Sequence, residues 1–106
     1  MPFSAAGDLD ELTYELEEDG VLVRKQLERR VLTRGAWATV LFLYRELDRA
    51  TGGYGPAKIA VVRFQKWHGG YRKHSAFPLS SEGEARELTS VVDAWRQHMS
   101  PLGAEE

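Results

Sequence analysis

The fold is decided by the stretch KIAVVRFQKWHGGYRKHSAFPL, which covers residues 58–79. Both halves of it are rich in β-branched and aromatic residues, and Gly69-Gly70 separates them. A two-residue glycine loop between such runs suits a tight hairpin turn, because glycine readily adopts the positive φ that this turn needs. The stretch therefore predicts two antiparallel strands, residues 58–68 and 71–79.

The position of the glycine loop also predicts which side chains share a face of this hairpin. With Gly69 and Gly70 as the loop, His68 pairs with Tyr71, and alternate residues along each strand lie on the same face. One face is apolar away from the turn and carries Ala60, Val62, Phe64, Phe77 and Leu79. The other face combines cationic, amide and aromatic side chains, namely Arg63, Gln65, Trp67, Arg72 and His74.

Two further strands are predicted before the hairpin and one helix after it. Residues 21–27 alternate in polarity, and residues 37–47 are rich in β-branched and aromatic side chains. Ser81 and Glu84 form a capping box, after which apolar residues recur at helical spacing and stop before Pro101. The predicted fold class is α+β, a four-stranded antiparallel sheet followed by a C-terminal helix whose apolar side lies on the sheet.

A chain of 106 residues has room for one domain. We expect an acidic tail over residues 1–12, a single ββββα domain over residues 13–99 and a C-terminal tail over residues 100–106. Residues 37–47 place apolar side chains on both faces of their strand. One helix cannot cover both sides of the sheet, so this pattern predicts a homodimer, either intertwined or held by its helices.

The formal net charge of −2 conceals a separation of charge along the chain. Residues 21–78 contain twelve basic and three acidic residues, a net charge of +9, whereas residues 1–20 contain seven acids and no base. Residues 79–106 contain six acids and two bases. A polyanion responds to the charge within a Debye length of about 10 Å, so the basic middle is expected to attract one. The alternative is a solvated sheet surface balanced by acidic neighbours.

An aromatic ring among guanidinium groups is the combination that single-stranded nucleic acid requires. Cations bind the phosphates, and each unpaired base that stacks on a ring contributes about 1–3 kcal/mol. The predicted face with Trp67 between Arg63 and Arg72 has this composition. The alternative is that Trp67 covers the end of the hairpin, with Arg72 stacked on it as a cation–π pair.

Several other classes of function find no support in the sequence. The chain has no cysteine, which excludes disulfides, thiolate zinc sites and cysteine nucleophiles. His68, His74 and His98 lack the spacing of metal ligands, and His74 and Ser75 are strand neighbours that point to opposite faces. We predict no enzyme activity, no cofactor and no metal. The longest apolar run, residues 40–44, is too short to span a membrane, so a cytoplasmic location is expected.

Three segments occur in an order that resembles a known family. They are GAW at residues 35–37, which opens a strand ending in YRELD at 44–48, then KIAVVRFQKW at 58–67, and FPLSSE at 77–82 before the helix. In this respect residues 20–99 resemble the single-stranded DNA-binding domain of the transcriptional coactivator positive cofactor four and its short bacterial relatives. The resemblance implies a homodimer formed through helices and neighbouring sheet surfaces, whose curved sheets grip unpaired strands.

The resemblance also assigns candidate residues. Arg45, Lys58, Arg63 and Trp67 match strand positions of the family, and Trp37 matches its Gly-Trp opening. Combined with the predicted face and the first strand, the candidate nucleic-acid-binding residues are Arg24, Trp37, Arg45, Lys58, Arg63, Gln65, Trp67, Arg72 and His74.

The resulting hypothesis is a dimeric basic sheet that binds single-stranded DNA without sequence specificity, in transcription regulation or DNA maintenance. Two alternatives stay open: a protein-interaction module whose basic sheet docks on an acidic partner, and an RNA-binding version of the same sheet. A further hypothesis concerns the N-terminal acids, which are placed to fold back on the basic surface and compete with phosphates.

Overall fold

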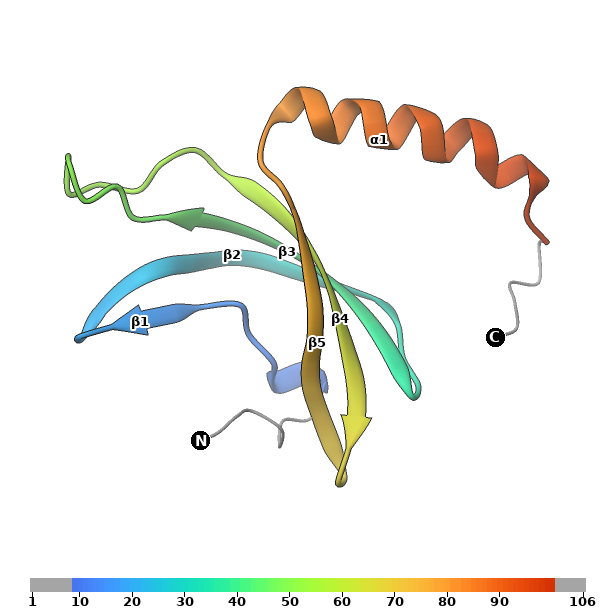
Figure 1. Cartoon of the computed structure of the whole chain (residues 1–106), viewed down its shortest axis with the longest axis horizontal. Coiled ribbons are helices and arrows are strands. Elements are labelled where there is room, and N and C mark those ends of the chain that lie inside the picture. The colour runs from blue at the N-terminus through green and yellow to red at the C-terminus, as the bar shows by residue number, and fades with distance from the viewer. Residues whose placement is uncertain (1–8, 101–106) are drawn as a thin grey trace.

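A computed structural model describes residues 9–100, which form a curled antiparallel sheet and a C-terminal helix (Figure 1). Residues 1–8 of the expected acidic tail and residues 101–106 of the expected C-terminal tail lie outside the described residues. The elements are the 3-10 helix η1 (Leu9–Glu11), β1 (Leu16–Glu18), β2 (Val21–Thr33), β3 (Trp37–Glu46), β4 (Lys58–Trp67), β5 (Gly70–Leu79), α1 (Glu82–Trp95) and the 3-10 helix η2 (Arg96–His98).

The predicted α+β class is confirmed, but the sheet of the described residues has five strands rather than four, in the order β1-β2-β3-β4-β5. The four expected strands are β2 to β5, and β1 is the additional one at the edge. It joins β2 through a tight turn in which Asp19 and Gly20 both have positive φ, 53° and 80°. Asp-Gly is a typical hairpin turn pair, and it reverses the chain here.

The hydrophobic core lies on one face of the sheet, which we call the core face. Its strand residues are Ala38, Val40, Phe42, Tyr44, Ala60, Val62, Phe64 and Tyr71. The N-terminal segment covers them from the inner side of the curl (Figure 1). Leu9 is only 2% exposed, and the Tyr14 ring stacks on Phe42 with centroids 5.5 Å apart. Leu9 and Leu12, which the sequence placed in an acidic tail, therefore complete the core.

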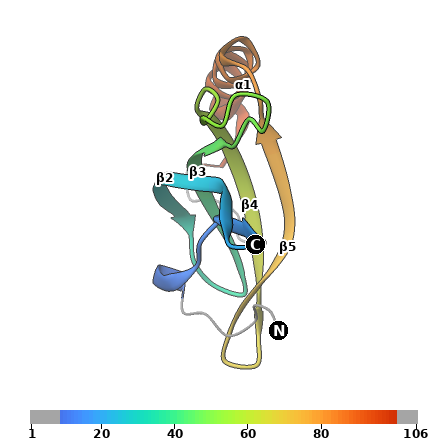
Figure 2. The same ribbon diagram turned by 90° about the vertical axis from the view of Figure 1, so that its left-hand side faces the viewer.

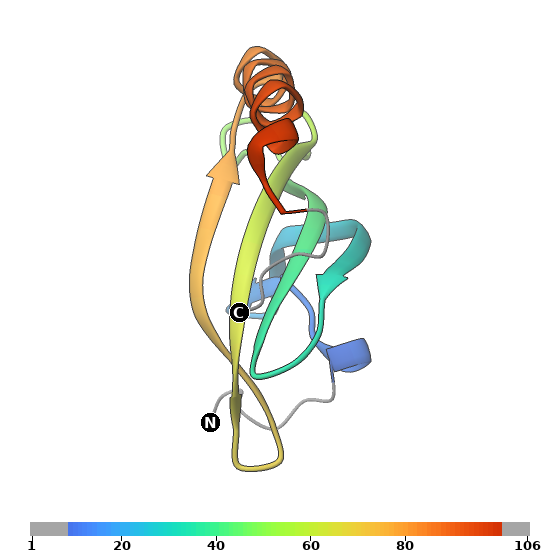
Figure 3. The same ribbon diagram turned by 90° about the vertical axis from the view of Figure 1, so that its right-hand side faces the viewer.

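The helix begins as predicted but does not lie on the sheet. The Ser81 hydroxyl accepts a hydrogen bond from the Glu84 amide at 3.0 Å, and the Glu84 carboxylate accepts one from the Ser80 amide at 3.2 Å. However, α1 has no buried residue among those that the structure describes. The helix projects sideways from the end of β5 (Figures 1 and 3). The prediction that its apolar side lies on the sheet is therefore wrong, because residues 9–14 already cover the core face.

The β4–β5 hairpin turns one residue earlier than predicted. Its central residues are His68 and Gly69, with φ of 48° and 82°, and Trp67 pairs with Gly70. A bulge then shifts the register between Arg63 and Phe64 of β4, at His74 of β5. In the side view, the turn lies at the opposite end of the sheet from α1 (Figure 2).

The bulge changes the face of the outer half of β5. Phe77 pairs with Val61 instead of Val62, and Leu79 pairs with Ile59. The prediction that Phe77 and Leu79 share the face of Val62 is therefore wrong. Phe77 is 53% exposed on the side of the sheet opposite the core. A single extra residue inverts the alternation of all strand residues beyond it.

Candidate nucleic-acid interface

The face of the sheet opposite the core, which we call the open face, is divided into two halves. Its half nearer α1 is apolar and carries Leu41, Leu43, Ile59, Val61 and Phe77. Its half nearer the β4–β5 turn is aromatic and cationic. We define the aromatic–cation cluster as the six side chains Trp37, Arg63, Gln65, Trp67, Arg72 and His74.

Each tryptophan of the aromatic–cation cluster is paired with an arginine. The guanidinium carbon of Arg72 lies 3.7 Å from the centre of the Trp67 ring. The guanidinium carbon of Arg63 lies 5.2 Å from the centre of the Trp37 ring. Both distances are within the range of cation–π attraction. The two pairs belong to neighbouring strands, because Trp37 is the first residue of β3 and Trp67 the last of β4.

Gln65 and His74 join the two pairs. Gln65 stands directly opposite Trp37 in the β3–β4 ladder and opposite Arg72 in the β4–β5 ladder. Its side-chain oxygen accepts a hydrogen bond from Arg72 Nη2 at 3.3 Å. The His74 ring, carried by the bulge, meets Trp37 edge to face with centroids 4.8 Å apart. Three strands thus build one continuous surface.

In the part of the chain that the structure describes, the arginines of this cluster have no carboxylate partner. Within residues 9–100, neither Arg63 nor Arg72 forms an ion pair. The two rings are accessible, with Trp37 41% and Trp67 38% exposed. Arg72 lies over one face of the Trp67 ring, and the His68 ring meets Trp67 edge to face with centroids 4.5 Å apart. The exposed parts of both rings and the positive charge beside them suit an anionic, aromatic ligand.

Three predicted residues lie elsewhere. Arg24 is on the core face, where its guanidinium lies 4.1 Å from the centre of the Tyr14 ring and 3.7 Å from Glu46. Lys58 forms an ion pair with the same carboxylate at 3.0 Å. Arg45 is exposed on the open face at the far end of β3, where it donates to the Gly55 carbonyl at 3.1 Å. The structure therefore brings together six of the nine candidates.

The open face also contains basic residues of β2 that the sequence did not single out. Arg30 stands opposite Leu41, and Lys25 stands opposite Arg45. The predicted strand ended at Leu27 because two bulges, at Leu27 and Leu32, interrupt the alternation that identifies a strand. Residues 28–31 read Glu-Arg-Arg-Val, which shows no alternation in polarity, so the sequence carried no signal for this part of the strand.

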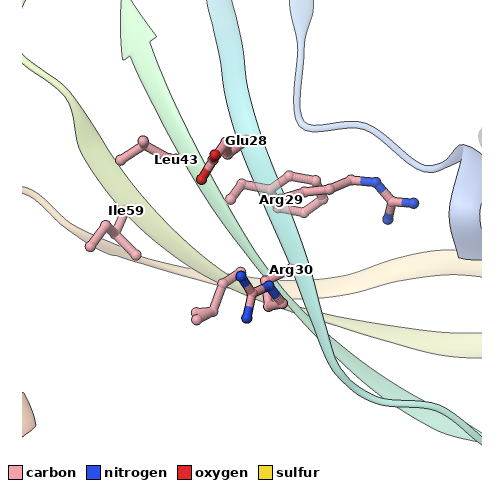
Figure 4. A pocket seen from close by; sticks show the side chains of 7 residues that line it. Glu28, Arg29, Arg30, Leu43 and Ile59 are labelled. Atoms are coloured by element: carbon pink, nitrogen blue, oxygen red, sulfur yellow. The ribbon is translucent and has the colours of Figure 1, made fainter.

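A shallow apolar cavity of about 230 Å³ lies between β2 and β4 at this point (Figure 4). It is lined by Glu28, Arg29, Arg30, Leu41, Phe42, Leu43 and Ile59. The Arg29 side chain extends away from the other labelled residues toward η1, where it donates to the carbonyl oxygens of Leu9 and Asp10 (Figure 4). Arg29 therefore belongs to the core face, and Arg30 is the cation that the open face gains.

Two of the described N-terminal acids, Asp10 and Glu18, form ion pairs with basic residues outside the aromatic–cation cluster. Asp10 lies within 3.5 Å of both Arg29 and Arg34, and Glu18 lies 2.9 Å from Arg49. These contacts hold the N-terminal segment on the core side and at the far end of the sheet. That the N-terminal acids compete with phosphates stays a prediction; the ion pairs of Asp10 and Glu18 are with residues outside the cluster.

Two further findings bear on the chain as a whole. Among residues 9–100, no helix has the length and apolar character needed to cross a membrane. Comparison of the chain with models of known protein families, with curated proteins and with solved structures gives no match.

Proposed function

We propose that the open face binds single-stranded DNA without sequence preference. The observation that carries the proposal is the aromatic–cation cluster: two half-exposed tryptophans, each beside an arginine that has no carboxylate partner within residues 9–100. Bases stack on the rings, and phosphates take the charge of Arg63 and Arg72. Because every base has a flat π face, this arrangement favours unpaired strands over particular sequences.

The spacing of the two rings suits neighbouring bases of one strand. Trp37 stands opposite Gln65, and Trp67 is two residues further along β4. Diagonal neighbours of this kind are about 7–8 Å apart, within reach of consecutive unstacked bases. Each guanidinium stacked on a ring keeps its N–H groups at the rim, where they donate to phosphate oxygens. Duplex DNA is disfavoured because its bases are already stacked and paired.

Self-association is the second part of the proposal, with a second copy of this chain covering the apolar side of α1. Leu88 and Val92 are exposed, and Trp95 is 69% exposed. A helix of 14 residues that buries none of its side chains gains little stability from packing, so α1 is expected to have a partner surface. The apolar half of the open face, with Leu43 and Phe77, supplies one on the second copy. The aromatic–cation cluster then stays free on each chain.

A dimer with one cluster on each chain holds two stretches of unpaired DNA or one looped strand. Non-specific binders of melted DNA act in transcription regulation and in DNA maintenance, and we assign the protein to this class of activity. An RNA ligand presents the same phosphates and base faces, and an acidic protein presents the charge alone. These two ligands are therefore the alternatives that the binding test has to separate.

Fluorescence anisotropy with a labelled oligonucleotide tests DNA binding. We expect tighter binding to single strands than to the duplex of the same sequence. With about two phosphate contacts, at Arg63 and Arg72, a fourfold rise in salt lowers the affinity about sevenfold. Equal affinity for both forms, or no salt dependence, contradicts the proposal. Unlabelled RNA and an acidic peptide serve as competitors, and displacement by the peptide alone favours the interaction module.

Light scattering tests self-association. Val92→Glu places a charge in the apolar side of α1 and is expected to convert a dimer into a monomer. Ser90→Glu is the matched control, since residue 90 is two positions from both Leu88 and Val92 and so lies on another side of the helix. A wild-type chain that is monomeric at micromolar concentration contradicts this part of the proposal and leaves DNA binding by a single chain intact.

A further inference from the structure

A second cationic surface lies on the other side of the same hairpin end. It is a cavity of about 420 Å³. Its lining consists of residues from η1, from the β2–β3 connection and from the β4–β5 hairpin: Leu9, Arg34, Gly35, Lys66, Gly69, Gly70 and Tyr71. Among these described lining residues two are basic and none is acidic.

This cavity and the aromatic–cation cluster are back to back. Lys66 and Trp67 are consecutive residues of β4, so their side chains leave the sheet on opposite faces. Lys66 pairs with Tyr71, whose ring belongs to the core, whereas Trp67 stands on the open face. In an antiparallel sheet of this order the β2–β3 and β4–β5 turns lie at the same end, as Figure 1 shows. Both turns therefore contribute to the cavity.

Hydrogen bonds fix the walls of the cavity. The Tyr71 hydroxyl donates to the Gly35 carbonyl at 2.7 Å, and the Lys66 amide donates to the Ala36 carbonyl at 2.8 Å. Together they hold the β2–β3 connection against the hairpin. Arg34 is placed at the rim by Asp10, whose carboxylate lies 3.3 Å from Arg34 Nη2. That carboxylate offsets part of the charge of Arg34, so Lys66 is the main cation of the cavity.

The Lys66 ammonium is available to a ligand. It is exposed, and within residues 9–100 it forms no ion pair. The tip of the β4–β5 hairpin, which lies between Trp67 and the cavity, contains Gly69 and Gly70. A Cβ atom placed on Gly69 meets nothing within 4 Å, so the surface around the tip is open. The turn also carries His68, whose ring meets the Trp67 ring edge to face with centroids 4.5 Å apart. A chain that stacks a base on Trp67 reaches Lys66 by passing over this turn.

We propose that the cavity binds a phosphate group, and that it takes the phosphate that follows the base stacked on Trp67. The ammonium of Lys66 and the free N–H groups of Arg34 are the donors, and the volume is in the range of pockets that hold small ligands. The assignment of this phosphate to a nucleic-acid strand rests on the proposed function. It extends that function by bending the bound strand around the end of the hairpin, from one face of the sheet to the other.

The test compares two lysines of the same hairpin and the same face. Lys66→Ala removes the cation of the cavity, whereas Lys73→Ala removes an exposed cation that does not line it. We expect Lys66→Ala to reduce the slope of log affinity against log salt by about 0.7, the value for one phosphate contact on a single strand. Lys73→Ala leaves the slope unchanged. Thermal melting verifies that both variants are folded.

A titration of the full chain with inorganic phosphate, followed by amide NMR, probes the cavity without DNA. We expect shifts at Lys66, Gly69 and Gly70 that disappear in Lys66→Ala. Equal slopes for the two variants, with no such shifts, overturn the phosphate site even if oligonucleotides bind in a Trp67-dependent way. Phosphate shifts without any oligonucleotide binding instead overturn the strand assignment together with the proposed function.

Two oligonucleotides, one with and one without a 5′-terminal phosphate, distinguish an internal phosphate of the strand from a terminal one. Equal dependence of both on Lys66 supports an internal phosphate of the bound strand. If Lys66→Ala weakens binding of only the 5′-phosphorylated oligonucleotide, the cavity binds terminal phosphates of strands. This result contradicts a bound strand that bends around the hairpin with an internal phosphate in the cavity.

Discussion

The guanidinium of Arg72 is stacked on the ring of Trp67 at 3.7 Å, on the face of the sheet that the core does not use. The cation–π pair is the arrangement that the alternative interpretation of Trp67 predicted, and a role of this pair in binding a base stays a prediction. A carboxylate partner for Arg72 would have indicated a structural role. Within residues 9–100 the guanidinium forms no ion pair; it covers one face of the indole and presents its own planar outer side and its charge to a ligand.

Replacement of Trp67 by alanine is expected to weaken single-stranded DNA binding and leave the fold intact. The loss of one stacking platform costs about 1–3 kcal/mol, which is about 5- to 150-fold in affinity. Anisotropy measures the affinity and thermal melting the stability. Leu32→Ala is the control, since Leu32 is exposed on β2 outside the cluster. If Trp67→Ala unfolds the domain, Trp67 is a core residue and the cluster is no binding surface.

Two arginines that the sequence placed in one set are expected to behave differently. Arg63→Ala removes an unpaired cation of the open face and reduces the salt slope of binding by about 0.7 without loss of stability. Arg24→Ala removes the stacking partner of Tyr14 and the ion pair with Glu46, which lowers the free energy of unfolding by about 1–2 kcal/mol.

Urea unfolding and anisotropy on both arginine variants separate these effects. The folded Arg24→Ala protein keeps its affinity and its salt slope. An equal loss of affinity in the two variants would show that the core face contributes to binding as much as the open face does.

The N-terminal segment is expected to be part of the folding unit. Leu9→Ala empties a buried position and lowers the free energy of unfolding by about 2 kcal/mol or more. Leu16→Ala, at an exposed position of β1, changes it by less than about 0.5 kcal/mol. Urea denaturation of the two variants measures both values. Equal stabilities would mean that residues 9–14 do not hold the core in solution.

Stability is expected to fall at alkaline pH through Tyr44. Burial raises the pKa of the Tyr44 hydroxyl above its ordinary value of 10.0, the neighbouring Tyr14 and Glu46 raise it further, and Arg24 opposes them. Because the unfolded chain then loses this proton first, the stabilisation is complete below pH 10 and declines as the pH rises toward the native pKa. Tyr44→Phe removes this titration.

The measurement for Tyr44 is the difference in unfolding free energy between wild type and Tyr44→Phe, from urea curves at several pH values. This difference should be constant up to about pH 9 and should then shift in favour of Tyr44→Phe as the pH passes 10. A difference that does not change with pH would show that Tyr44 is not the group that titrates.

Local patterns were sufficient to predict much of the sheet and of the cluster. Runs of β-branched and aromatic residues identified β3, β4 and β5, and the Ser81 capping box predicted the start of α1. Gln65, Trp67 and Arg72 were placed on one face correctly although the turn was placed one residue late. Near the turn the observed pairing differs from the predicted one by two residues, which preserves the alternation. Odd-numbered residues of β4 therefore still share a face with even-numbered residues of β5.

Two features could not be predicted from the sequence. One is a single-residue bulge, and the other is which of two segments far apart in the sequence covers the core face. A one-residue bulge at His74 leaves no trace in composition, yet it inverts the faces of Phe77 and Leu79. Seven acids in residues 1–20 obscured the apolar positions Leu9 and Leu12. The predicted place of the helix was wrong for the same reason, because residues 9–14 occupy the core face on which it was expected to lie.

The indole N–H signals of the three tryptophans test the central claim most directly. Adding unlabelled single-stranded oligothymidylate to ¹⁵N-labelled protein should shift the signals of Trp37 and Trp67 together and leave Trp95, on α1, in place. Alanine variants assign the three signals. Shifts confined to Trp95, or no shift in any indole signal at saturating oligonucleotide, would contradict binding by the aromatic–cation cluster.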